Sequence, residues 1–108
     1  VKNDELEVCL ADFGLATRNG PFPEYEKTRT GQAGTPCYYC YEIIKKLPYD
    51  ERCDVWSIGV LMYILLCGAP PFDGEDDSDI IESIKIGKYS MTGKIWDQIS
   101  SEAKKLIK

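Results

Sequence analysis

The distribution of apolar residues predicts a short N-terminal strand, a long loop and then helices. Residues 6–10 alternate apolar and polar before ending apolar, which is typical of a half-buried strand. The turn signal Asn3-Asp4 precedes them, so Val1-Lys2 would end the partner strand of a β-hairpin. Residues 15–36 contain glycine and proline at scattered positions. Their sequence follows neither the helical nor the strand period, which indicates a long, functional loop.

The most apolar stretch predicts a helix over residues 55–67. Asp54 lies near its start, where a carboxylate caps free N–H groups and opposes the helix dipole, and Gly68 supplies the stop. A shorter helix over residues 42–47 precedes it and is ended by Pro48. Because the apolar side chains of the 55–67 helix point to every side, we expect this helix to be buried all round.

Two amphipathic helices complete the pattern. One is capped by Asp77, Ser78 or Asp79 and ends at Gly87, and the other begins at Ser100. The predicted fold class is therefore mainly α, with one short β-hairpin, a long loop and about four helices. Three shorter helices leave the 55–67 helix incompletely covered, so we expect the isolated chain to form a dimer or an aggregate.

Composition and charge narrow the function classes. The 108 residues carry a net charge of −5, which argues against nucleic-acid binding through a basic face. Histidine is absent, which removes the commonest general base and metal ligand. The apolar run of residues 55–67 is shorter than the roughly 20 residues that span a bilayer, and no signal peptide is visible, so a cytoplasmic location is expected.

Five cysteines are irregularly spaced, which favours reduced thiols. Cys37 and Cys40 form a Cys-x-x-Cys pair, but Cys53 and Cys67 do not form a second close pair. A small redox or zinc module is therefore an alternative hypothesis, and the absence of a second close cysteine pair argues against it.

Asp12 is the first candidate for catalytic chemistry. It follows the predicted strand and precedes Gly14, and a carboxylate in that position is suited to binding Mg²⁺ beside phosphate oxygens. Taken alone, Asp12-Phe13-Gly14 would fit an ordinary turn as well.

Motifs further along the chain favour the magnesium-binding interpretation of Asp12 over the ordinary turn. Gly34-Thr35-Pro36, Glu42, the run Asp-Val-Trp-Ser-Ile-Gly at 54–59 and Gly-x-Pro-Pro-Phe at 68–72 follow Asp-Phe-Gly in order. This set resembles the C-lobe of eukaryotic Ser/Thr protein kinases, and residues 53–68 resemble most the calmodulin-dependent and calcium-dependent kinases. The resemblance covers residues 1–108, and it implies a partial kinase domain that lacks the N-lobe and the catalytic loop.

The resemblance implies roles for individual residues near the nucleotide. Asp12 would bind Mg²⁺, Ala11 would line the ATP pocket with Phe13 and Gly14 beside it, and Phe13 would also pack into a regulatory hydrophobic column. The loop at residues 15–34 would be the activation loop, and Thr28 and Thr30 within it would be phosphorylation sites.

Further roles concern the protein substrate and the scaffold. The Thr35 hydroxyl would bond the catalytic aspartate outside this chain, and Gly34 and Tyr38 would form the substrate pocket. The remaining implied residues are structural: Glu42 would pair with an arginine beyond Lys108, Asp54 would hold the catalytic-loop backbone, and Trp56 would pack beneath the activation loop.

Some positions depart from the family pattern. Cys40-Tyr41 replaces Ala-Pro before Glu42, which removes a fixed φ angle, and Ile64 replaces a glutamate that binds a substrate arginine in cyclic-nucleotide-dependent kinases. The acidic stretch at 75–79 would either attract basic peptides or form a solvated cap.

Two functions follow from the resemblance. In the first, the parent protein transfers the γ-phosphoryl group of ATP to protein Ser or Thr, with Mg²⁺, and responds to Ca²⁺ through calmodulin or an EF-hand segment outside this chain. These residues alone would be inactive, because the Gly-rich loop, the strand lysine and the catalytic loop are missing from them. In the second, the chain is a non-catalytic, pseudokinase-like lobe that acts in binding or scaffolding.

Overall fold

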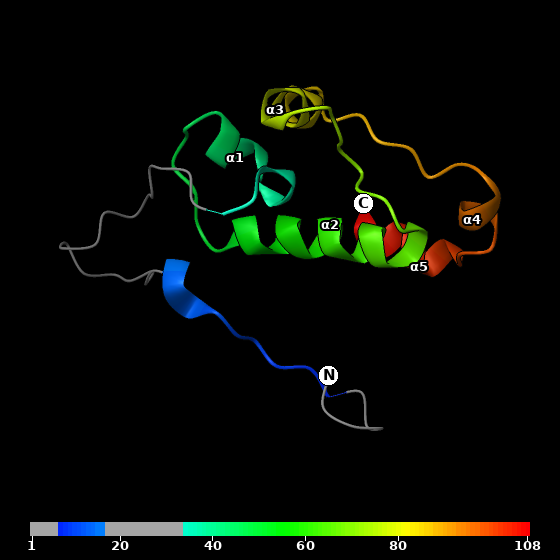
Figure 1. Cartoon of the computed structure of the whole chain (residues 1–108). Helices are drawn as coiled ribbons and strands as arrows, with labels where there is room; N and C mark the ends of the chain where they lie inside the picture. Colours follow the sequence, from blue (N-terminus) through cyan, green and yellow to red (C-terminus); the bar gives the residue numbers. More distant parts are fainter. Residues whose placement is uncertain (1–6, 17–33) are drawn as a thin grey trace.

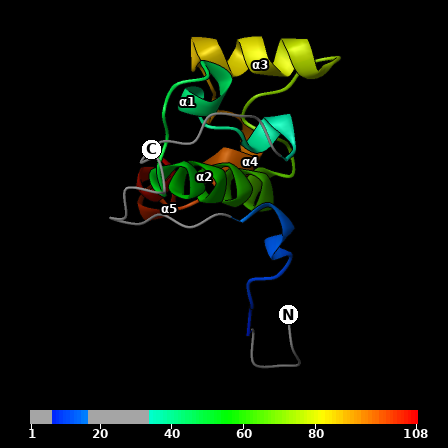
Figure 2. The ribbon, with the colours of Figure 1, turned by 90° about the vertical axis from the view of Figure 1, so that its left-hand side faces the viewer.

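The computed structural model describes residues 7–16 and 34–108, and the regular secondary structure of this part is almost entirely helical, arranged around one long helix, α2. The helices are α1 (Tyr41–Ile44), α2 (Arg52–Cys67), α3 (Asp77–Ile86), α4 (Lys94–Asp97) and α5 (Ser101–Ile107), with 3-10 turns η2 (Phe13–Leu15) and η3 (Pro36–Tyr38). Figures 1 and 2 show α1 and η3 between α2 and α3, whereas α5 packs directly on α2. The mainly helical C-lobe architecture expected from the sequence is confirmed.

Local hydrogen bonds and a glycine explain where the long helix α2 begins and ends. The Asp50 carboxylate accepts a hydrogen bond from the Arg52 amide at 3.0 Å, so Asp50, one position before the N-cap Glu51, satisfies the first N–H group of the helix. Asp54 lies inside that turn, where its charge still opposes the helix dipole. Gly68 ends the helix with φ of 82° and donates its amide to the Ile64 carbonyl at 2.7 Å.

The shorter helices also follow capping rules. Asp76, rather than the three cap candidates that follow it, accepts from the Asp79 amide at 2.9 Å at the start of α3. Ser100 caps α5 by accepting from the Ala103 amide at 3.2 Å, as predicted. The four-residue helix α4 was not predicted, because Lys94–Asp97 is too short to show a helical period.

The core lies between α1, η3 and α3. Four buried residues make it, and partly buried side chains from α1, α2 and α3 pack against it; the buried set is Tyr39, Ile44, Phe72 and Ile84. Trp56 of α2 stacks on Phe72, with ring centroids 5.8 Å apart and planes 8° apart. This stack joins the long helix to the core.

A second aromatic contact holds the C-terminal segment on α2. Tyr63 packs against Trp96 with ring centroids 4.7 Å apart, and it meets Tyr89 edge to face. Its hydroxyl donates to the Ser90 carbonyl. The chain between α3 and α4 is therefore fixed along the second half of α2.

Two expectations from the sequence are wrong. The long helix is not buried all round: Val60 and Tyr63 are buried, but Val55, Ile58 and Leu65 are 67%, 55% and 74% exposed. The half-buried strand predicted over residues 6–10 is not formed at residues 8–10, where Val8 and Leu10 are 82% and 87% exposed; Glu7 makes a single bridge, and Leu6 lies outside the described residues. Val1-Lys2, the expected partner strand, lies outside the described residues.

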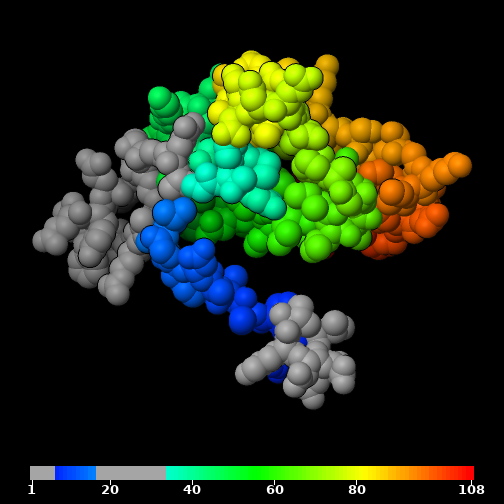
Figure 3. All heavy atoms as spheres, viewed as in Figure 1, coloured from blue at the N-terminus to red at the C-terminus, as the bar shows by residue number. Residues whose placement is uncertain are grey.

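Residues 7–16 extend away from the helices, which Figure 3 shows in blue. Among the helices that the structure describes, none combines the length and the apolar character needed to cross a bilayer.

Candidate functional site

Asp12 adopts a left-handed backbone conformation, with φ of 63° and ψ of 65°. Such a conformation is uncommon for a residue other than glycine, although aspartate adopts it more readily than most, and it occurs often at functional sites. The chain then turns through Phe13–Leu15, and the Ala16 amide donates to the Phe13 carbonyl at 3.0 Å. Asp12 is exposed, and its carboxylate makes no hydrogen bond or ion pair with another described residue.

This carboxylate fits the role of one Mg²⁺ ligand. Mg²⁺ needs one or two protein carboxylates and completes its shell with water and phosphate oxygens. Within residues 7–16 and 34–108, no group of three or more His, Cys, Asp or Glu side chains is arranged to hold a metal by itself. Asp12 therefore belongs to no preformed metal cage of this kind in the described residues, and a zinc centre at Cys37 and Cys40 finds no support in this part of the chain.

The residues around Asp12 are also exposed. Ala11 and Gly14 are exposed, and Phe13 is 67% exposed. The packing that the resemblance implies for Phe13 is thus not provided by the described residues. Thr28 and Thr30, the predicted phosphorylation sites, lie outside the described residues.

The segment of residues 34–39, which we name the 34–39 turn, is held in a compact shape. Gly34 has φ of 109°, a conformation that favours glycine, and Thr35 precedes the η3 turn with extended backbone angles. The Tyr38 amide donates to the Thr35 carbonyl at 3.1 Å and the Tyr39 amide to the Pro36 carbonyl at 3.0 Å. Thr35 is exposed, and its side chain makes no cap hydrogen bond.

Two side-chain hydroxyls fasten this turn to the rest of the fold. Ser57 of α2 donates to the Tyr38 carbonyl at 2.9 Å, and Tyr39 donates to the Gly34 carbonyl at 2.6 Å. Sequence reasoning assigned no role to either hydroxyl. The one available signal was Ser57 itself, a polar residue among the apolar residues of α2.

Acidic side chains lie close to the 34–39 turn. Burial and then the charges of Asp73 and Asp77 raise the pKa of the Cys37 thiol. Burial and the charge of Asp77 likewise raise the pKa of Tyr39. The start of α3 therefore places negative charge beside the predicted substrate pocket.

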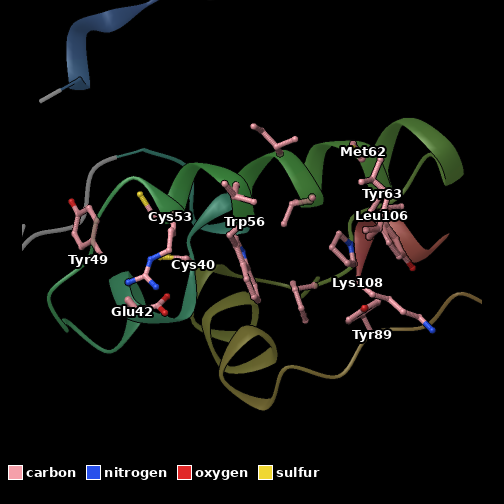
Figure 4. A pocket seen from close by; sticks show the side chains of 18 of the residues that line it. Cys40, Glu42, Tyr49, Cys53, Trp56, Met62, Tyr63, Tyr89, Leu106 and Lys108 are labelled. Atoms are coloured by element: carbon pink, nitrogen blue, oxygen red, sulfur yellow. The ribbon is translucent and has the colours of Figure 1, made fainter. Parts of the chain in front are cut away.

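A cavity of about 630 Å³ lies along α2, and Figure 4 shows side chains that line it. Cys40, Glu42 and Tyr49 lie at one end, and Tyr63 and Leu106 lie at the other. The lining is largely apolar, so the cavity continues the incompletely covered surface of α2.

Glu42 lies within electrostatic reach of an arginine of this chain. Hydrogen bonds to Asp50 are the main reason why the pKa of Arg52 is raised, and the charge of Glu42 adds a smaller contribution. The Arg52 guanidinium itself is paired with Asp50 at 2.7 Å. The charge of Glu42 therefore acts on a guanidinium that is already paired with Asp50.

Two predicted structural residues lie on the first turns of α2. Asp54 is exposed, and the Cys53 thiol donates to its carboxylate at 3.7 Å. Trp56 is half-buried on Phe72, and its indole Nε1–H is buried without a hydrogen-bond partner among the described residues. The structure thus brings Trp56 and Ser57 together with the 34–39 turn, whereas residues 11–14 project from the body.

Comparison with known proteins identifies the family to which the chain belongs. The family model described as the protein kinase domain matches residues 1–108, which is the whole chain. The chain belongs to the protein kinase family. The resemblance predicted from the motifs is therefore confirmed.

Relatives of this kinase chain include calcium-dependent enzymes. Calcium-dependent protein kinase 3 of Plasmodium yoelii yoelii is 47% identical over 99% of the chain, and calcium-dependent protein kinase 5 of Plasmodium berghei is 50% identical over 97%. Calcium/calmodulin-dependent protein kinase type 1 of Caenorhabditis elegans is 39% identical over 98%. The chain spans 18–29% of the length of these three relatives.

Proposed function

We propose that this chain is part of a Ser/Thr protein kinase that transfers the γ-phosphoryl group of ATP to a hydroxyl of a protein substrate and is regulated by calcium. The observation that carries the proposal is the exposed Asp12 carboxylate, in a left-handed turn, within a chain that matches the protein kinase domain over its whole length. The names of the calcium-dependent relatives support the calcium regulation. The calcium sensor, calmodulin or an EF-hand segment, would lie outside residues 1–108.

In this reaction the substrate hydroxyl oxygen forms a bond to the γ-phosphorus while the bond to the bridging oxygen of ADP breaks. The hydroxyl proton passes to a base outside these residues. Mg²⁺, held in part by Asp12, would offset the charge of the phosphate oxygens.

The 34–39 turn supports the choice of a protein hydroxyl as acceptor. Its outer surface is exposed at Gly34 and Thr35, and its inner side is fastened to α2 through Ser57. A rigid, exposed turn suits the docking of an extended peptide, because little order has to be imposed on binding. The nearby charges of Asp73 and Asp77 favour substrates with basic residues.

A non-catalytic lobe that acts in binding or scaffolding is the second candidate. Cys40-Tyr41 in place of Ala-Pro and the incompletely covered α2 surface favour it. Phosphoryl transfer distinguishes the two candidates, since a scaffold would not need the Asp12 carboxylate.

The test uses the full-length protein that contains these residues, assayed for transfer of radiolabelled γ-phosphate to Ser and Thr peptides, with and without Ca²⁺. Replacing Asp12 by Asn removes the metal-binding charge, and we expect transfer to fall by about 10³-fold or more. The same change at exposed Asp97, in α4, is the matched control and should leave transfer unchanged. Equal activity of Asp12→Asn and the natural protein would exclude the proposed role of Asp12, and no transfer by the natural protein would favour the scaffold.

A further inference from the structure

The hydroxyl of Tyr39 links the end of the 34–39 turn to its beginning. It donates to the Gly34 carbonyl at 2.6 Å, in a partly buried position. The Tyr39 side chain is 8% exposed and belongs to the core cluster with Phe72 and Ile84, whereas Gly34 is exposed. A donor fixed in the core therefore holds a carbonyl on the surface of the turn.

Within residues 7–16 and 34–108, the other hydrogen bonds of the turn do not reach Gly34. The two backbone bonds join Tyr38 to Thr35 and Tyr39 to Pro36, and Ser57 binds the Tyr38 carbonyl. Among the described residues, the Tyr39 hydroxyl is thus the group that fixes Gly34. Gly34 also has φ of 109°, which a flexible backbone would readily leave, so this contact selects one of many accessible shapes.

The environment keeps this hydroxyl a donor. Burial, with a smaller contribution from the charge of Asp77, raises the pKa of Tyr39. A phenol already protonated at neutral pH becomes still harder to ionise under these conditions. The hydroxyl therefore keeps, at neutral pH, the proton that it donates to the Gly34 carbonyl.

We propose that Tyr39 is a positioning residue for the protein substrate: its hydroxyl holds the Gly34 carbonyl, and this fixes the exposed surface at Gly34 and Thr35 on which the substrate chain docks beside its phosphoacceptor. The inference rests on the proposed kinase function. The proposed role of Tyr39 is to keep the turn ordered before the peptide binds, since a preformed turn loses less entropy when a peptide docks.

The test compares Tyr39→Phe with the natural full-length protein. Phenylalanine keeps the ring in the core and removes only the hydroxyl. We expect KM for a peptide substrate to rise by about 2- to 10-fold, the range that the loss of one neutral hydrogen bond allows. KM for ATP should stay unchanged, because the turn is a docking surface for the peptide.

The matched control is Tyr41→Phe. Tyr41 is 41% exposed, and its hydroxyl makes no hydrogen bond among the described residues. The same atom is removed two positions away, so this variant should keep the KM of the natural protein. A second measurement, hydrogen–deuterium exchange over residues 34–38, should be faster in Tyr39→Phe and unchanged in Tyr41→Phe.

The outcomes separate this inference from the function on which it rests. Unchanged peptide KM or unchanged exchange in Tyr39→Phe, in an active kinase, overturns the positioning role and leaves the kinase function intact. Equal losses for peptide and ATP also overturn it, because they indicate a general structural defect. A natural protein without phosphoryl transfer overturns the proposed function and this inference together.

Discussion

The hydroxyl of Ser57, in α2, donates to the backbone carbonyl of Tyr38, 2.9 Å away and 19 positions earlier in the chain. The same hydroxyl lies 3.2 Å from the Cys53 carbonyl, one helical turn back. Ser57 therefore fastens the 34–39 turn to the longest helix of the fold.

We predict that Ser57→Ala lowers the free energy of unfolding by about 1 kcal/mol, because the partly buried Tyr38 carbonyl loses its partner. Exchange of amide hydrogens in residues 36–39 should become faster. Ser78→Ala, on the exposed surface of α3, removes the same atom and should change the stability by less than about 0.5 kcal/mol. Equal effects of the two variants would contradict the role of Ser57.

Removing the ring of Phe72 should be far more costly. Phe72 is 4% exposed and stacks on Trp56, so Phe72→Ala should lower the free energy of unfolding by about 3–5 kcal/mol. Urea denaturation followed by tryptophan fluorescence measures this change. Phe13→Ala is the matched control, since Phe13 is 67% exposed and its loss should cost little.

Two glycines of the α2 region should respond to alanine in opposite directions. Gly68 ends α2 with φ of 82°, so Gly68→Ala should destabilise the protein by about 1 kcal/mol. Gly59 lies inside the helix, and a Cβ there would meet the Ile107 carbonyl oxygen at an ordinary 3.9 Å. Gly59→Ala should therefore be neutral or stabilising by up to about 1 kcal/mol, which thermal unfolding can measure.

The exposed surface of α2 should govern the association of the isolated chain. Ile58 and Leu65 are 55% and 74% exposed, and apolar patches of this kind drive self-association. We expect the 108-residue chain to form dimers or larger species in light scattering, and the double variant Ile58→Glu and Leu65→Glu to shift it toward monomer. Leu10→Glu, which adds charge away from α2, should not change the size. A natural chain that is already monomeric would contradict this prediction.

The cysteines should differ in their reaction with iodoacetamide. Cys40 is 2% exposed, and burial, the largest cause, raises the pKa of its thiol. The thiolate is the reactive form, so its fraction at Cys40 rises only at a pH above the usual range for cysteine. Mass spectrometry at about pH 8, close to the ordinary cysteine pKa, should show Cys9, which is exposed, labelled well before Cys40. Equal labelling in the folded chain would indicate that the 34–44 region opens readily.

The sequence by itself determined the features that depend on neighbouring residues. Gly68, Gly87 and Ser100 mark helix ends correctly because capping acts within one turn of the chain. The order of the motifs that begin with Asp12 was enough to predict the protein kinase family, which the match over residues 1–108 confirms.

Only the tertiary structure decided which side chains meet across the chain. Three such contacts cannot be recognised from any periodic pattern in the sequence. They are the hydrogen bond from Tyr39 to the Gly34 carbonyl, the hydrogen bond from Ser57 to the Tyr38 carbonyl, and the stack of Trp56 on Phe72. The extent to which α2 is covered could not be predicted either. Helical periodicity shows which side chains are apolar, but burial depends on which other elements reach each face of the helix.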